Sequence, residues 1–514
     1  MGAIADTLTE AGHNVTILMP VMDYEQQDKT GVRLTKDIIK VPPAPEMIAW
    51  LQWEKELLRE VWTIEISFFQ LIQIAKNMTK SFTYQCKNNS AACDGLFRRR
   101  WILGHSSVDG LKLEEEKFDV GIAEAFTVCG FGIFELAKIP TTIAATSTVH
   151  LDIVAEAIGE PITPSYVPGA RSSAGDQMNF MERIKNIMGT MFGKVFFRDL
   201  FQGETAAFRE KFGLYFKSFE ELFPEVSYVF TNSNPYLDYP RPMIHKTVPI
   251  GGIAVSLDTE RNKLSESWNA ILNERNTTVL VSFGSVAKTV FMPDLYKNSL
   301  LTLFESMPET TFIVKYEEER SKMAAHLPNV HLSPWLPQNA LLADPRLTVF
   351  ITHGGLGSIT ELAHLGKPAI IIPLFAEQPR NADMLAKHGG GIVLTKFDLG
   401  KPEKLKETLL KIFNNASFSQ NAKRLSKMLL NQPISAKELV VRHSEFAARF
   451  GGLPNLDPYG RQLSLVQAWT FGPSVSGPHL TAVTHKGLDC TTELAHQRKP
   501  EICIPIFADL PRSE

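Results

Sequence analysis

The residues best suited to chemistry lie in the second half of the chain, each just after an apolar run. His353, Gly355, Gly357 and Ser358 follow the run LTVFIT, which begins at residue 347. Glycine lets a backbone turn sharply and approach a ligand closely. A helix that begins after such a loop presents unpaired N–H groups and partial positive charge, which favour phosphate. The loop is therefore a candidate phosphate site, in which His353 can donate to an oxygen and Ser358 can cap the helix.

Further polar and aromatic residues accompany this loop at set distances. Glu361 lies one turn into the expected helix, Glu377 and Gln378 follow the next apolar run, and Trp335 ends the run before. Because ligands of open parallel sheets lie beyond the carboxyl ends of the strands, these side chains should meet one ligand. Trp335 offers a stacking face, Glu361 can accept two ribose hydroxyl protons, and Glu377 with Gln378 can bind a hexose. The spacing predicts a site for a nucleotide that carries a sugar.

Short apolar runs alternate with helical patterns along the chain, which indicates an α/β fold with parallel sheets. The expected strands are 14–20, 117–126, 139–146 and 226–233, then 277–285, 310–316, 330–335, 347–355 and 368–376. Residues 45–100 and 176–222 are expected to be helical insertions, whose apolar residues could line a pocket or pack the core. The two groups of strands predict two Rossmann-like domains that join near Pro249–Gly252.

Composition excludes few functions. The chain has 514 residues, 44% of them apolar, and a net charge of −3, which gives no electrostatic reason to expect nucleic acid as the main partner. Five cysteines are too few and too scattered for a disulfide framework. Cys86 and Cys93 flank a short polar loop and could pair, or all the cysteines could remain thiols.

Residues Phe350 to Gln378 resemble the nucleotide-sugar signature of the UDP-glycosyltransferases, the family of UDP-glucuronosyl- and UDP-glucosyltransferases. The stretches WLPQ at 335–338 and FGS at 283–285 add to a resemblance that runs from about residue 2 to 470 and looks closest to nematode-type members. It implies a GT-B fold, in which two Rossmann-like domains face each other across a cleft. Acceptor binding would fall to residues 1–250, UDP-sugar binding to 251–436, and a helical segment at 437–470 would precede a membrane anchor.

The resemblance also implies residue roles. Trp335 and Gln338 would hold the uracil, Glu361 the ribose, and Glu377 with Gln378 the sugar. His353, Ser285 and the loop of Gly355, Gly357 and Ser358 would hold the diphosphate, and Glu124 would orient the histidine that acts as general base. Three plainer readings stay open: Trp335 as core packing, Glu361 as a solvated helix residue, and Glu124 as a loop carboxylate.

The implied reaction is inverting transfer of glucuronate or glucose from a UDP-sugar to a hydroxyl of a small lipophilic acceptor. No cofactor is implied, and without an Asp-x-Asp motif no metal is implied either. A homo-oligomer is possible, and the expected location is the luminal side of the endoplasmic reticulum membrane. The chain as written shows no signal peptide, and no apolar run reaches the roughly 18 residues that span a bilayer.

Two departures from the family favour an alternative. The chain opens with a helical pattern, MGAIADTLTEAGH, so the expected domain lacks its first strand and the loop that carries the family's histidine. Neither His13 nor His105 matches that histidine. The alternative is a non-catalytic UDP-sugar-binding protein or partner subunit. An esterase reading of the His-Gly-Gly loop fails for want of a Gly-x-Ser-x-Gly elbow.

Residues 471–514 contain a degraded partial repeat of the signature. Thr484–Arg512 matches Thr352–Arg380 at most positions and keeps the apolar strand residues. The chemistry is lost, since Gly354, Gly357, Ser358 and Gln378 are replaced by Lys486, Asp489, Cys490 and Leu510. A partial duplication and a gene model that joins a neighbouring relative both fit this repeat. With no domain of its own to pack against, the repeat is expected to be poorly ordered or loosely docked.

Overall fold

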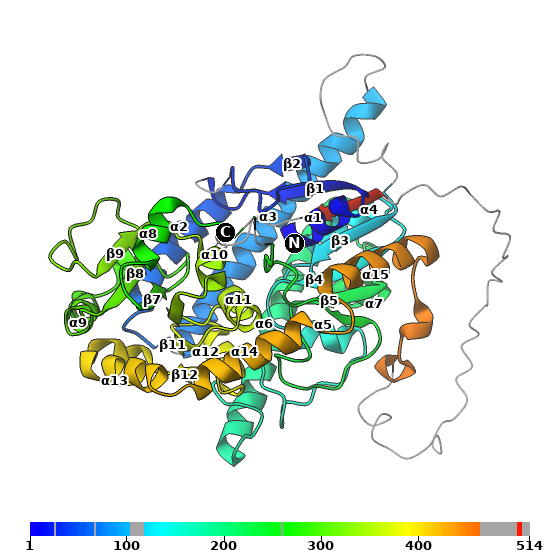
Figure 1. Ribbon diagram of the computed structural model, residues 1–514. Helices are drawn as coiled ribbons and strands as arrows, with labels where there is room; N and C mark the ends of the chain where they lie inside the picture. The colour runs from blue at the N-terminus through cyan, green and yellow to red at the C-terminus, as the bar shows by residue number, and fades with distance from the viewer. Residues whose placement is uncertain are drawn as a thin grey trace.

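The computed structural model describes residues 1–24, 27–65, 68–102, 118–258, 260, 262–462 and 501–505. These residues form two parallel sheets, each covered by helices on both faces (Figure 1). The first sheet runs in the order β2 (Asp37–Val41), β1 (Asn14–Pro20), β13 (Glu501–Pro505), β3 (Val120–Glu124), β4 (Thr142–Thr146), β5 (Tyr228–Thr231), β6 (Thr247–Pro249). The second runs β12 (Gly391–Val393), β11 (Ala369–Ile371), β10 (Leu347–Thr352), β7 (Thr277–Ser282), β8 (Thr310–Lys315), β9 (Val330–Ser333).

The first sheet is buried on both faces, as its near-continuous apolar strands require. One face packs against α1 (Gly2–Glu10) and α15 (Ala436–Phe450), the other against α4 (Cys129–Leu136), α5 (Asp152–Ala157), α6 (Phe180–Phe212) and α7 (Phe219–Glu225). Helix α1 buries Ile4, Ala5 and Leu8 on one side, which confirms the helical reading of the opening residues. Because α15 follows the second sheet in sequence, the chain returns to complete the first (Figure 1).

The second sheet has the same layered construction. Helices α9 (Asp294–Glu305) and α13 (Pro402–Phe413) cover one face, and α10 (Gln338–Ala343), α11 (Leu356–Leu365), α12 (Gln378–Ala386) and α14 (Ser417–Leu430) cover the other. Helix α8 (Glu266–Leu272) leads into this half from the first sheet. A strand forms within each range expected from the apolar runs. The short strands β2, β6 and β12 lie outside those ranges and were not expected.

The helical insertion of residues 45–100 forms α2 (Pro45–Glu60) and α3 (Phe68–Ile102), and α3 packs along α6. Trp62, just after α2, enters the core of the second half, where its ring lies 5.2 Å from that of Phe283. Lys396 donates to the carbonyls of Val61 and Ile64 at the same point. Helix α2 therefore connects the two halves close to the loop that follows β7.

Strand β13 corrects the expectation for the repeat. Residues 501–505 pair in parallel with β1 on one side, where Thr16 faces Cys503, and with β3 on the other, where Gly121 faces Cys503. The prediction of loose docking is wrong for these residues, because they occupy the centre of the first sheet. An empty place there would leave buried backbone N–H and C=O groups of two strands unpaired. Lys486, Asp489, Cys490 and Leu510 lie outside the described residues.

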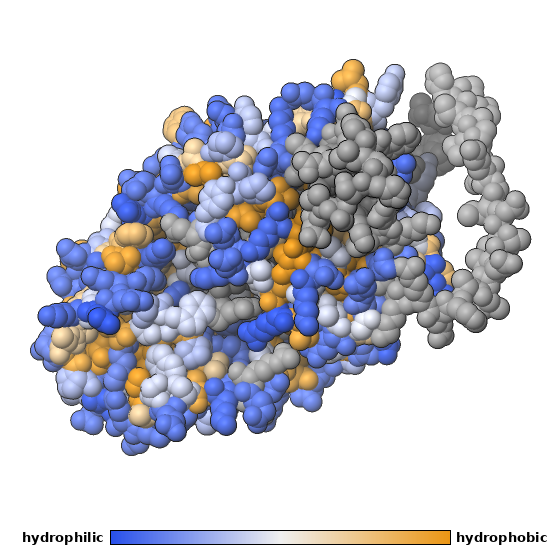
Figure 2. Space-filling model, turned by 90° about the horizontal axis from the view of Figure 1, so that it is seen from above, coloured by the Kyte–Doolittle hydropathy of each residue, from blue (hydrophilic) through white to orange (hydrophobic). Residues whose placement is uncertain are grey.

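The cysteine pairing also differs from expectation. Cys86 forms a disulfide with Cys129 at the start of α4, not with Cys93. None of the helices in the described ranges has the length and apolar character that crossing a bilayer requires. Viewed from above, the surface is mostly hydrophilic, and its apolar side chains gather in short patches (Figure 2).

Candidate functional site

The glycine-rich loop joins β10 to α11, as the sequence predicts. β10 ends at Thr352, and α11 begins at Leu356 after the N-cap residue Gly355. Gly354 has a φ of +86°, a left-handed value that glycine adopts without strain. The expectation that Ser358 caps the helix is wrong, because Ser358 lies inside the first turn and the cap makes no side-chain hydrogen bond. The first N–H groups of α11 are thus left for a ligand.

The imidazole of His353 sits between two glycines. A Cβ built on Gly284 would lie 2.6 Å from His353 Cε1, and one on Gly355 would lie 2.6 Å from Nε2. Side chains at either position would displace the ring. Burial, together with the charge of Lys315, lowers the pKa of His353 to about 4. His353 is therefore neutral at pH 7 and can donate through one ring nitrogen only.

A hydrogen-bonded cluster joins α10 to α11 beside this loop. The Gln338 amide donates to Ser358 Oγ at 3.1 Å and to Glu361 Oε2 at 2.5 Å. Burial raises the pKa of Glu361 to about 7, and the Gln338 hydrogen bond opposes part of that rise. Gln338, Ser358 and Glu361 come from separate stretches of the sequence motif, and the structure brings them together.

Open space lies on the ligand side of the cluster. A Cβ at Gly357 would meet no atom within 4 Å, so protein packing does not require glycine at this position. Trp335 follows β9 with its side chain 47% exposed, which rules out the core-packing reading of this residue. Lys29, from the loop after β1, places its Nζ 5.8 Å from the centroid of the Trp335 ring. The indole face is therefore accessible and has a cation nearby.

Lys315 is a member of this site that the motif did not indicate. It ends β8, is 7% exposed, and donates from Nζ to the carbonyl of Gly284 at 2.8 Å. Burial lowers the pKa of Lys315, and the charges of Lys29 and Lys288 act in the same direction. Its position at the end of the apolar run TTFIVK is the sequence feature that could have indicated Lys315 as a site residue. Together these amines place positive charge beside Gly284 and Ser285.

Glu377 and Gln378 stand at the start of α12, after β11. The Gln378 side-chain oxygen accepts the backbone N–H groups of Leu374 at 2.8 Å and Phe375 at 3.1 Å, so the amide is held in one orientation. Burial raises the pKa of Glu377, while the charges of Arg171 and Arg380 oppose that rise. Arg171 belongs to the first half of the chain, so this end of the site receives charge from both halves.

Glu124 ends β3, at the edge where the resemblance places an orienting acid. Its side chain is buried, and its two oxygens accept the N–H of Ser147 after β4 at 3.0 and 3.1 Å. His13 precedes β1 at the opposite end of the parallel sheet, where Nε2 lies 3.1 Å from Glu445. Buried His150 lies 3.0 Å from Glu160. His105 falls outside the described residues.

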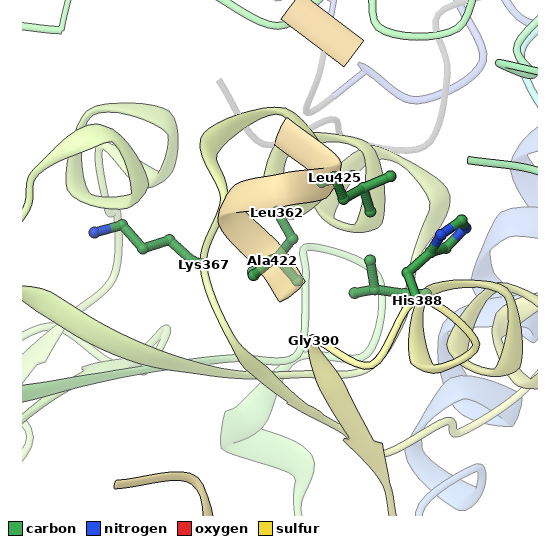
Figure 3. A pocket seen from close by; sticks show the side chains of 8 residues that line it. Leu362, Lys367, His388, Gly390, Ala422 and Leu425 are labelled. Atoms are coloured by element: carbon green, nitrogen blue, oxygen red, sulfur yellow. The ribbon is translucent and has the colours of Figure 1, made fainter. Parts of the chain in front are cut away.

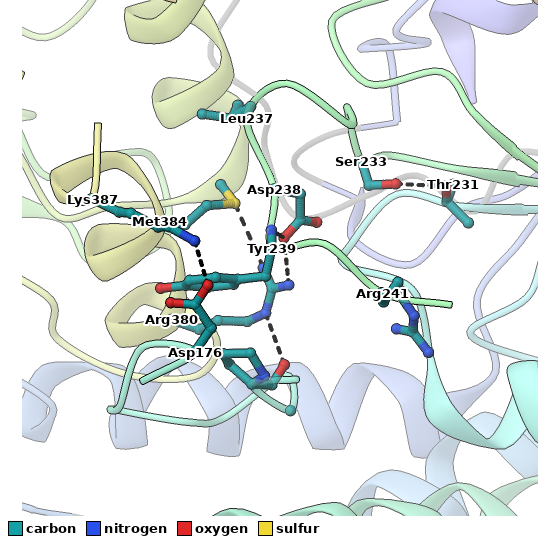
Figure 4. Close-up of polar contacts among 12 residues, drawn as sticks. Asp176, Thr231, Ser233, Leu237, Asp238, Tyr239, Arg241, Arg380, Met384 and Lys387 are labelled. Carbon is teal, nitrogen blue, oxygen red and sulfur yellow. Dashed lines mark hydrogen bonds and ion pairs between the residues drawn. The ribbon is translucent and has the colours of Figure 1, made fainter. Parts of the chain in front are cut away.

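A polar cluster holds α12 against loops of the first half (Figure 4). Buried Arg380 donates to Asp238 at 2.6 Å and to the carbonyl of Pro168 at 3.3 Å, and its guanidinium lies 5.2 Å from the ring centroid of Tyr239. Lys387 lies 5.3 Å from the same centroid and pairs with Asp176. Because Glu377 and Gln378 begin this helix, the cluster sets their distance from the first half.

A cavity between α11, α12 and α14 is a packing gap and not a ligand site. Leu362, Leu385, Ala422 and Leu425 line it together with His388 (Figure 3). Its volume of about 10 Å³ is the space that one water occupies.

Comparison with known proteins identifies the family of this chain. The family model for UDP-glucuronosyl and UDP-glucosyl transferases matches residues 1–472. A Caenorhabditis elegans protein, ugt-47, whose name carries a provisional UDP-glucuronosyltransferase assignment, is 27% identical over 91% of this chain and 85% of its own length. Human UDP-glucuronosyltransferase 1A1 is 26% identical over 91% of this chain and 83% of its own length.

Solved structures show the same fold. The glycosyltransferase of kitacinnamycin superposes with a TM-score of 0.55 at 15% identity, over 89% of this chain and 95% of that one. LpCGTa, solved in complex with UDP, gives a TM-score of 0.51 at 14% identity, over 86% and 94%. The two sheets are therefore the two Rossmann-like domains of a GT-B fold. Because the family model matches residues 1–472, the chain belongs to the UDP-glucuronosyl and UDP-glucosyl transferase family, whose members are hexosyltransferases.

Proposed function

We propose that this protein transfers glucuronate or glucose from a UDP-sugar to a hydroxyl of a small lipophilic acceptor, with inversion at the anomeric carbon. The observation that carries the proposal is the arrangement at the start of α11. Neutral His353 lies between Gly284 and Gly355, Gly357 opens onto empty space, and Glu361 is held by Gln338. This is a cradle for a diphosphate with a ribose beside it.

Each residue has a role in the proposal. Trp335 stacks on uracil with Gln338 at its edge, and Glu361 accepts the ribose hydroxyls. His353, Ser285, Ser358 and the N–H groups around Gly355 and Gly357 bind the diphosphate. Glu377 and Gln378 bind the sugar. The acceptor oxygen bonds to the anomeric carbon and its proton passes to solvent water, as the bond to the UDP oxygen breaks and UDP leaves as an anion. Positive charge near the diphosphate, to which Lys315 contributes, stabilises the departing UDP without a cofactor or metal.

The acceptor would lie on the α2–α3 side of the cleft. A hollow of about 250 Å³ there is lined by Trp53, Leu57 and Ile74 together with Glu56 and Glu60. The same helix leads to Trp62, which packs on Phe283 next to the proposed diphosphate loop. Apolar walls with a few carboxylates suit a lipophilic molecule that presents a hydroxyl. Location at the luminal side of the endoplasmic reticulum membrane, and assembly into a homo-oligomer, are proposed from family membership alone.

One observation favours a second candidate, a UDP-sugar-binding protein without turnover. Both oxygens of Glu124 accept the Ser147 N–H. A carboxylate engaged in this way is a weaker partner for a catalytic histidine, and loss of a general base costs roughly 10²–10⁴-fold in rate.

Two measurements separate the candidates. Thermal unfolding with and without UDP tests binding, and release of UDP from UDP-glucuronate or UDP-glucose, with a panel of phenols and with EDTA present, tests transfer. Transferase function predicts stabilisation and acceptor-dependent UDP release that EDTA leaves unchanged. Stabilisation without release in any combination would support the binding protein. No stabilisation by UDP would contradict both candidates.

A further inference from the structure

The centre of the first sheet is a slot for one strand, and the sequence repeat supplies its occupant. Strand β13 lies between β1 and β3, seen in red beside β1 in Figure 1. Its register with β1 runs from Asn14 opposite Glu501 to Leu18 opposite Pro505. Asp119 fixes the start of the strand, since its N–H donates to the Glu501 carbonyl at 2.8 Å and its carboxylate accepts the Glu501 N–H at 2.7 Å.

The side chains of β13 match both faces of the slot. Ile502 and Ile504 are fully buried in the cluster formed with α1 and α15. Cys503 points into the opposite cluster, which contains Phe131 and Phe134. Its neighbour across the ladder is Gly121, where a Cβ would lie 2.7 Å from the Phe134 ring. The face of the sheet that packs on α4 is therefore crowded here and accommodates only a small side chain at position 503.

The C-terminal end of β13 also packs closely against its surroundings. Pro505 lies against Gly130 at the start of α4, where an added Cβ would approach Pro505 Cγ to 3.1 Å. In the first copy of the repeat, the equivalent residues form β11, which pairs with β10 and β12 in the other sheet. There Ile371 stands at the position of Cys503. Two similar stretches therefore serve as strands of two different sheets.

We propose that residues 501–505 are a complementing strand, bound in the slot between β1 and β3 of the same molecule, and that the first domain depends on it for stability. The repeat thereby has a structural role that needs none of the residues lost from its glycine loop. Removing the strand would expose the inner edges of β1 and β3 and uncover the apolar surface that Ile502 and Ile504 cover. The second sheet does not pair with the described residues 501–505 and would keep its structure.

Hydrogen exchange on the full chain tests the proposal directly. We expect the amides of residues 501–504 to be protected by a factor of at least about 10³, comparable with 15–19 and 120–124, as for other central strands. In the variant I502D/I504D, protection should fall in 15–19 and 120–124 but persist in 277–282 and 347–352. The control E501T, which changes a partly exposed side chain, should leave all four segments protected. Rapid exchange of residues 501–504 in the unaltered chain would overturn the proposal.

A cross-link identifies the molecule that provides the strand, and it does not depend on the stability of a disrupted variant. Thr16 and Cys503 face each other across the β1–β13 ladder. In T16C, mild oxidation should join residues 16 and 503, detected by mass spectrometry of the non-reduced peptides, in a species of monomer mass. A cross-link found only in dimers would assign the strand to a second copy and contradict the proposal, as would its absence.

Discussion

Gln338 and Glu361, separated by a strand and a loop in sequence, are joined by a 2.5 Å hydrogen bond from amide to carboxylate. This bond fixes the Glu361 side chain at the place where the proposed ribose would lie. Burial disfavours the ionised carboxylate and therefore raises the pKa of Glu361.

Replacing Glu361 by Gln should weaken UDP binding. Each hydrogen bond to a carboxylate contributes about 1.5–3 kcal/mol, and the Gln amide oxygen can keep one of the two, so a loss of about ten- to a hundredfold in UDP affinity is expected. Isothermal titration measures this loss. Glu407 is exposed on α13, and E407Q is the matched control, which should bind UDP as the unaltered chain does. Equal affinity of E361Q and E407Q would remove Glu361 from the ribose site.

The affinity for UDP should also depend on pH. Glu361 has a pKa of about 7, and only its ionised form accepts both hydroxyl protons. Between pH 6 and pH 8 the ionised fraction rises about tenfold, so the Kd for UDP should fall by a similar factor. The same series on E361Q corrects for titration of the UDP phosphate. An identical pH profile in both proteins would contradict the role of Glu361.

Gly357→Asp places in the loop the residue that the repeat carries at the equivalent position, Asp489. The new side chain meets open space, so unfolding should change little, but its charge faces the diphosphate. A loss of at least about a hundredfold in UDP affinity is expected, since like charges brought together cost several kcal/mol. Gly189 on α6 also has open space around it, and G189D is the control for adding aspartate to a helix. Retained UDP binding by G357D would place the diphosphate elsewhere.

Glu204 on α6 should make stability depend on pH. It is 1% exposed, and burial raises its pKa to about 8, although the N–H groups of Val128 and Cys129 oppose that rise. The folded state therefore holds a proton that the unfolded state loses near the ordinary pKa. Stability contributed by this proton is complete below about pH 4.5 and is lost progressively up to about pH 8, at up to about 1.4 kcal/mol per pH unit.

Chemical unfolding of E204Q at several pH values checks this dependence. The amide keeps an acceptor for the Val128 N–H, which Glu204 accepts at 2.7 Å, and cannot ionise. The variant should match the unaltered chain near pH 5 and exceed its free energy of unfolding near pH 8. A constant difference across the range would show that Glu204 does not titrate as proposed.

Arg380→Ala should destabilise the contact between the halves much more than Lys387→Ala. Arg380 is buried and pairs with the partly buried Asp238, and breaking a buried pair typically costs about 3–5 kcal/mol. The Lys387 side chain is 42% exposed, and exposed pairs contribute about 0–1 kcal/mol. Unfolding free energies of both variants test this order. The double variant R380A/D238A should recover part of the loss, because no buried charge then lacks its partner.

Much of the second half of the chain could be predicted from sequence alone. Strands β7, β8, β10 and β11 are apolar runs that are almost wholly buried, and the candidate site residues follow such runs. Trp335, His353, Gly357 and Glu361 all lie at the edge where the spacing predicted them. Local patterns suffice here because parallel strands bring their carboxyl ends to one side of the sheet whatever their order.

Other features were decided only by the tertiary structure. Lys315 and Arg171 reach the site from a strand end and a loop that no motif marks, since their role depends on the distance between segments far apart in sequence. The Cys86–Cys129 disulfide depends on α3 packing beside α4. Above all, PEICIP and PAIIIP predict the same kind of buried strand, and sequence cannot say which sheet each joins. That choice depends on which sheet has unpaired backbone groups and an apolar gap to fill, a property of the assembled fold and not of either stretch.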